Sequence, residues 1–109
     1  MSLPSVIDVK HAKIDSAGSG DNTVLSAVSG KRLLVTSLFL VAAGTVNVRF
    51  ESGASGTALT GQVNLVANTG FALSYNEYGW FVTDKDELLN LELSGAVSVD
   101  GSISYREID

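Results

Sequence analysis

The sequence predicts an all-β fold: an antiparallel β-sandwich, jelly-roll-like, with eight or nine short strands. No stretch of the 109 residues carries an apolar stripe of helical period, whereas several short segments alternate apolar and polar residues with period two. Turn signals separate these segments at intervals of about 8–12 residues, a spacing typical of sandwiches. Eleven glycines and a single proline suit many tight turns.

The longest apolar run, at residues 31–41, is predicted to form a strand with two apolar faces. Such a strand must be covered on both sides. We therefore expect the core of the subunit to cover one face, and a second layer or another subunit to cover the other. One predicted face holds Leu33, Val35, Phe39 and Val41. The other holds Leu34, Leu38 and Leu40. The candidate oligomer interface on this strand consists of Leu34, Leu38 and Leu40.

The remaining segments are predicted in order along the chain. Residues 1–22 are expected to form an N-terminal edge strand or arm with a flexible Gly/Ser connection, and residues 23–109 the β-sandwich domain. Residues 45–51 alternate cleanly, which predicts a hairpin with the central run. Gly101, in the middle of the last strand, predicts a bulge or a close backbone approach. Further strands are expected at 23–28, 63–67, 71–75, 80–83, 89–93 and 97–105.

Composition excludes several classes of function. The net charge is −5 and no basic cluster is present, so we expect no nucleic-acid partner. No apolar stretch is long enough to span a bilayer and no signal-peptide pattern begins the chain, so we expect a soluble protein without a membrane partner. Charged residues make up 17%, below the roughly 25% of typical soluble domains. The resulting weakly polar surface favours assembly.

No residue is predicted to be catalytic, to bind a cofactor or to bind a metal. His11 is the single histidine and has no serine motif around it, so a Ser-His-Asp triad is not indicated. The glutamates at 51, 77, 92 and 107 are scattered, and their spacing suggests no catalytic pair. The sequence has no cysteine. We therefore expect a protein that is not an enzyme.

A cluster of aromatic residues at 75–81 allows two interpretations. In the first, Tyr78 and Trp80 anchor a core or a subunit interface, and they join the candidate oligomer interface. In the second, Tyr75, Tyr78 and Trp80 are exposed and stack on sugar rings. The second interpretation would make the protein a carbohydrate-binding β-sandwich module.

The sequence resembles a group of small tailed-phage virion proteins of β-sandwich or jelly-roll type. The segments that carry the resemblance are 67–71, 78–83, 88–94 and 97–105, with 30–35 upstream. The resemblance covers residues 23–108 and rests on turn glycines and strand hydrophobics. It implies a non-enzymatic structural virion protein, either a capsid decoration or stabilising protein or a tail-associated one. It also implies a homo-oligomer, with a trimer favoured, that binds a protein lattice such as a phage capsid or tail.

Overall fold

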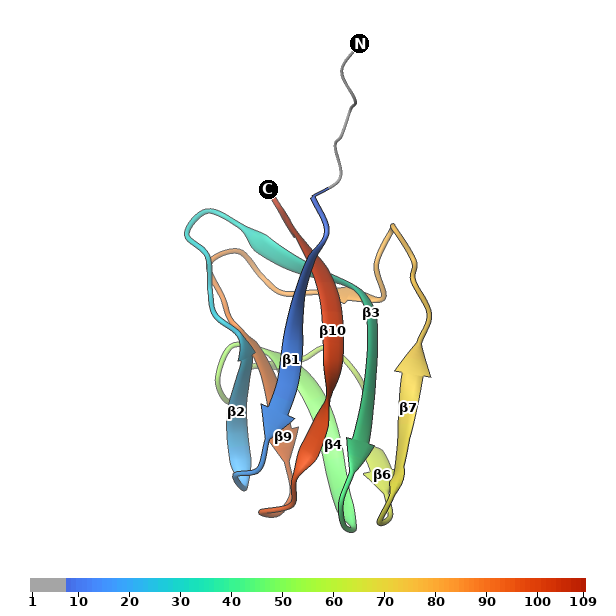
Figure 1. Cartoon of the computed structure of the whole chain (residues 1–109). Helices are drawn as coiled ribbons and strands as arrows, with labels where there is room; N and C mark the ends of the chain where they lie inside the picture. Colours follow the sequence, from blue (N-terminus) through green and yellow to red (C-terminus); the bar gives the residue numbers. More distant parts are fainter. Residues whose placement is uncertain (1–7) are drawn as a thin grey trace.

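The computed structural model describes residues 8–109, which form ten strands in two antiparallel sheets (Figure 1). The predicted all-β antiparallel sandwich is confirmed, with about ten strands in place of eight or nine because the two-residue strand at residues 57–58 was not foreseen. None of the described residues forms a helix that could cross a bilayer. The strands are β1 (Lys10–Ser16), β2 (Gly20–Leu25), β3 (Arg32–Ala42), β4 (Val46–Ser52), β5 (Thr57–Ala58), β6 (Val63–Leu65), β7 (Thr69–Leu73), β8 (Phe81–Val82), β9 (Leu89–Leu93) and β10 (Val99–Ile108).

The strand order is that of a jelly roll. The first sheet, sheet A, has the order β1-β10-β3-β7, with β8 also paired to β3. The second, sheet B, has the order β2-β9-β4-β5, with β6 also paired to β4. Strands β1 to β4 alternate between the two sheets, and β9 and β10 return to pair beside β2 and β1. This wrapping of antiparallel strands into two packed sheets defines the jelly-roll architecture.

The core lies between the inner faces of the two sheets. Sheet B contributes alternate side chains of β4 and β9, and sheet A contributes those of β1, β3 and β10. Removing these apolar side chains from water is the main favourable contribution to folding. The largest fully buried apolar side chains are those of Ile14, Leu33, Leu40, Phe50, Leu89, Leu91, Leu93 and Ile103.

A β-bulge in the central strand corrects the predicted faces. Ser104 of β10 pairs with Ser37, but Tyr105 pairs with Val35, so Thr36 is an extra residue on β3. An extra residue reverses the inward and outward alternation of the side chains beyond it. Leu33 and Val35 therefore point inward before the bulge, while Phe39 and Val41 point outward after it and are 52% and 47% exposed. The prediction that placed all four on one face was wrong.

The same bulge moves Leu38 and Leu40 into the core. The alternation of the sequence predicts both on an outward apolar face, as parts of an oligomer interface. In the structure both are buried between the sheets and belong to the hydrophobic core of the subunit. Neither side chain reaches the surface through which a second copy would bind, so the outward placement of these two residues was wrong.

The N-terminal part of the described chain is integrated in the sandwich. Residues 10–16 form β1, an edge strand paired with β10, and β2 begins at residue 20 and pairs with β9. The expected boundary between residues 22 and 23 thus falls inside a strand. The arm expected at the start of the chain includes residues 1–7, which lie outside the described residues.

Two glycines allow the neighbours of β3 to approach it closely. A Cβ on Gly101 of β10 would collide with the carbonyl oxygen of Phe39, and a Cβ on Gly70 of β7 would collide with that of Leu40. The close backbone approach predicted at Gly101 is therefore confirmed. The two glycines flank the same part of β3 from opposite sides.

Candidate functional site

The remaining candidate interface residues lie at the surface or near it. Leu34 is half-buried, Trp80 is 45% exposed and Tyr78 is 83% exposed. Large exposed aromatic side chains are the residues that most often anchor protein interfaces. The interface role of Leu34, Tyr78 and Trp80 stays a prediction, because no second copy is present.

The turn that carries these aromatics is fixed by hydrogen bonds to the central strand. The Asn76 N–H donates to the Thr36 carbonyl oxygen at 2.9 Å, and the Trp80 N–H donates to that of Val35 at 2.8 Å. Within the turn, the Tyr78 N–H donates to Asn76 Oδ1 at 3.0 Å, and the Trp80 indole N–H donates to the Ser74 carbonyl oxygen at 2.8 Å. The aromatic side chains therefore project from an ordered turn.

Gly79 is required in this turn. Its φ of +83° is a conformation that side chains other than glycine rarely adopt. A Cβ at this position would also collide with the side chain of Leu34. Leu34 therefore packs against the backbone of the turn, which explains its partial burial.

The three aromatics proposed for sugar stacking do not share one site. Tyr75 borders a shallow depression on the outer face of sheet A. Trp80 lines a different cavity, an apolar cleft between the two sheets. Tyr78 lines neither of them. The three residues are therefore divided between different surface features, and their joint role in sugar stacking stays a prediction.

The apolar cleft has a volume of about 340 Å³ and lies between β4, β6, β7 and β8. Phe50 lies against Phe81 with their ring centroids 5.3 Å apart, and Phe71 and Trp80 also line the cleft. Among the described residues, Thr60 is the single lining residue that bears a hydroxyl, and that hydroxyl accepts a hydrogen bond from the Phe50 N–H. The cleft therefore suits an apolar occupant.

The two sides of the sandwich differ in charge. Strands β5 and β6 flank β4, and β7 and β8 flank β3, so residues 57–82 form one side of both sheets (Figure 1). Glu77 is the only charged residue among them. The opposite side, formed by β1 and β2 within residues 8–25, carries five charged residues. We call residues 57–82 the uncharged side.

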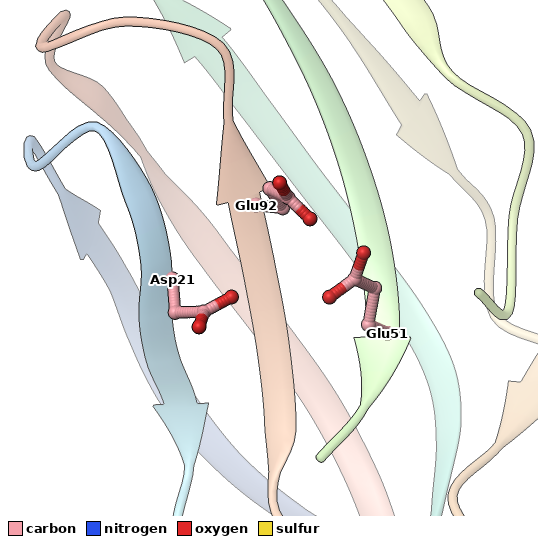
Figure 2. Close-up of side chains that lie close together, drawn as sticks. All are labelled: Asp21, Glu51 and Glu92. Atoms are coloured by element: carbon pink, nitrogen blue, oxygen red, sulfur yellow. The ribbon is translucent and has the colours of Figure 1, made fainter. Parts of the chain in front are cut away.

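A cluster of carboxylates lies on sheet B, although the spacing of these residues in the sequence suggested no pair. Asp21 of β2, Glu51 of β4 and Glu92 of β9 point toward one another (Figure 2), with one oxygen of each within 4.8 Å of the others. Glu51 is only 1% exposed. Strand register brings them together, since β9 lies between β2 and β4. Register between distant strands is not readable from residue spacing.

Arg49 and Asn90 hold the oxygens of Glu51. The Arg49 guanidinium donates to Glu51 Oε2 from Nε at 2.9 Å and from Nη2 at 2.5 Å, and Nη2 also donates to Glu92 Oε1 at 3.2 Å. Asn90 Nδ2 donates to Glu51 Oε1 at 2.9 Å and to Asp21 Oδ1 at 2.8 Å. Because both oxygens of Glu51 are occupied, the cluster is a closed hydrogen-bond network of the sheet.

The network shifts the pKa values of its carboxyl groups in opposite directions. Burial alone would raise the pKa of Glu51, but hydrogen bonds from Glu92, Arg49 and Asn90 lower that pKa overall. The hydrogen bond to Glu51 and the charge on Glu51 raise the pKa of Glu92. Hydrogen bonds from Ser55 and Asn90 lower the pKa of Asp21. The carboxyl groups of Glu51 and Glu92 therefore titrate as an interacting pair, in which Glu92 has the raised pKa and Glu51 the lowered pKa.

Comparison with known proteins identifies the fold. The chain matches no protein-family model and no curated protein. Among solved structures it is similar to one described as "Bacillus endospore appendages form a novel family of disulfide-linked pili", with a TM-score of 0.56 and 14% sequence identity. The similarity covers 100% of this chain and 98% of that one. At this identity the likeness shows a shared β-sandwich fold.

Proposed function

We propose that this protein is a non-enzymatic structural subunit that assembles with copies of itself through the uncharged side. The observation that carries the proposal is the contrast between residues 57–82, with a single charged residue, and the charged opposite side. Exposed strand edges invite pairing with another chain, and charged side chains are a common means of preventing it. The edge strands of the uncharged side lack this protection.

Further features of the uncharged side support the proposal. Val66 is 59% exposed and Tyr78 projects from its ordered turn, so both are available to a second copy. The apolar cleft lined by Trp80 offers a place for an apolar side chain of that copy. The similar solved structure is a pilus subunit, which is itself an assembling structural protein. Those pili are disulfide-linked, whereas this sequence has no cysteine, so the proposed assembly does not rest on disulfides of this sequence.

The phage capsid or tail location and the trimer stay predictions of the sequence resemblance, and the similar pilus structure does not support them. The two kinds of assembly differ in symmetry: a trimer closes on itself, whereas a pilus-like array stays open-ended. Light scattering coupled to size-exclusion chromatography would give one discrete mass if the protein forms a trimer. Electron microscopy would show filaments if it forms an open array.

A charge-insertion experiment tests the proposed surface. In the variant Ala58→Lys with Val66→Lys, two exposed positions of the uncharged side become cationic. We expect this variant to remain folded by circular dichroism and to lose assembly. The matched control, Ala17→Lys with Thr23→Lys, adds the same charge at exposed positions on the opposite side and is expected to assemble normally. Equal assembly of both variants would contradict the proposal.

A further inference from the structure

The outer face of sheet A carries a shallow depression of about 310 Å³, a volume at the lower end of those of small-molecule sites. A row of polar side chains crosses it. His11 of β1 pairs with Ser104 of β10, and Ser104 pairs with Ser37 of β3. Ser74, just after β7, lines the depression at the far end of this row. The row therefore repeats at the strand spacing, about 4.8 Å.

Aromatic surface borders the polar row. Phe39 and Tyr75 both line the depression, and Tyr75 is 54% exposed. The neighbours of Phe39 in the sheet are small, with Ala72 on one side and Ser102 on the other. Small neighbours leave the Phe39 ring uncovered, which explains why a phenylalanine in a central strand is half-exposed.

The polar groups retain capacity for further hydrogen bonds. Ser104 Oγ lies 2.7 Å from Thr36 Oγ1 and 2.5 Å from Ser37 Oγ, and each hydroxyl can both donate and accept. Within the described residues, the imidazole of His11 and the hydroxyl of Tyr75 form no hydrogen bond. No Asp, Glu, Lys or Arg from the described part of the chain lines the depression. Its chemistry is therefore that of neutral hydroxyls and one imidazole beside aromatic rings.

We propose that this depression binds a neutral glycan. The C–H face of a pyranose ring carries slight positive charge and packs on the negative face of an aromatic ring, here Phe39 or Tyr75. The sugar hydroxyls donate to and accept from His11 and Ser37, whereas the buried Ser104 holds the Ser37 hydroxyl in place from below. An anionic ligand is disfavoured because the lining residues include no Lys or Arg to neutralise it. This site goes beyond the proposed assembly and does not depend on it.

Calorimetric titration of the wild-type protein with cellohexaose and with chitohexaose tests the proposal. We expect at least one of these neutral hexasaccharides to bind with a Kd on the order of 1 mM. Phe39→Ala and Tyr75→Ala should each weaken binding roughly tenfold, and His11→Ala should weaken it less. Tyr78→Ala is the matched control, since it removes an exposed aromatic side chain outside the depression.

Several results would overturn the glycan site. One is the absence of heat above dilution with both hexasaccharides at about 10 mM. Another is equal weakening by Tyr78→Ala, which would place the sugar elsewhere. The native mass of each variant, measured in parallel by light scattering, distinguishes glycan binding from assembly. Loss of assembly in Phe39→Ala and Tyr75→Ala would mean that the outer face of sheet A is a contact between copies and not a glycan site.

Discussion

Gly101 lies on β10 opposite Leu40 of β3, and its lack of a side chain leaves room for the neighbouring backbone. Gly101→Ala would place a Cβ against the Phe39 carbonyl oxygen, so β10 must move away from β3. Local backbone strain of this kind costs about 1–3 kcal/mol. We expect urea unfolding to show a free energy of unfolding lower by about that amount.

Gly61 provides the control for this substitution. An added Cβ there meets no atom within 4 Å, and Gly61 does not require a positive φ. Gly61→Ala should leave stability unchanged or raise it by about 0.4–1 kcal/mol, because alanine restricts the unfolded chain. A loss of stability equal to that of Gly101→Ala would argue against the collision as the cause.

A proton on Glu92, held by the neighbouring Glu51, predicts a pH dependence of stability. Because the folded protein raises the pKa of Glu92, it binds this proton more tightly than the unfolded chain does. The resulting stabilisation is present at pH below the ordinary glutamate pKa of 4.5 and is lost as pH rises through the raised value. Glu51 behaves in the opposite sense, because its lowered pKa gives stability that is lost as pH falls.

Glu92→Gln separates these two effects. The amide is neutral at every pH and can still donate a hydrogen bond to Glu51. We expect the variant to have a higher urea midpoint than the wild type at pH 7, and the difference to shrink as pH falls below the raised pKa of Glu92. Glu77→Gln serves as the control on an exposed turn. A difference between Glu92→Gln and wild type that is constant with pH would contradict the raised pKa of Glu92.

At the scale of elements, the bulge at Thr36 decides which half of β3 faces the core. Leu40→Ala removes a buried side chain and leaves a cavity, so we expect it to lower the free energy of unfolding by about 2–5 kcal/mol. Phe39→Ala, one position earlier, removes a half-exposed ring and should change stability by less than about 1 kcal/mol. Chemical denaturation of both variants measures the contrast. The opposite order of effects would mean that β3 is not bulged as described.

The hydroxyls at the bulge are part of the same element. Thr36 is fully buried, and its Oγ1 lies within hydrogen-bond distance of Ser104 Oγ. This bond compensates for removing a hydroxyl from water. The buried threonine in the middle of the apolar run is thus the extra residue of the bulge. The sequence alone does not distinguish it from an ordinary strand position.

At the scale of the whole molecule, the proposed assembly surface predicts how assembly responds to salt. Contacts through a side with one charged residue are dominated by apolar burial and backbone pairing, which salt does not screen. We expect the native mass, measured by light scattering at fixed protein concentration, to be unchanged between about 0.05 and 1 M NaCl. Dissociation at the higher concentration would indicate that the charged side carries the contacts.

The fold class and most of the strands could be predicted from the amino-acid sequence. Period-two alternation and turn glycines are local signals, and alternation is clear at residues 46–50 and 89–93, where one face of the strand is buried. The two-residue strand β5 was missed because so short a segment carries no period of its own, whereas β8 lies within the strand expected at residues 80–83. The close approach at Gly101 was predicted because a glycine inside a strand often marks a place where another backbone comes near.

Tertiary structure alone decided three features. The bulge at Thr36 reverses the faces of β3, and it arises from pairing with β10, a strand more than 60 residues away. Pairing of β4 with β9 brings Glu51 close to Glu92, and pairing of β1 and β3 with β10 aligns His11, Ser104 and Ser37 in one row. Strand register is set by the packing of the whole sandwich, so no spacing within the chain encodes it.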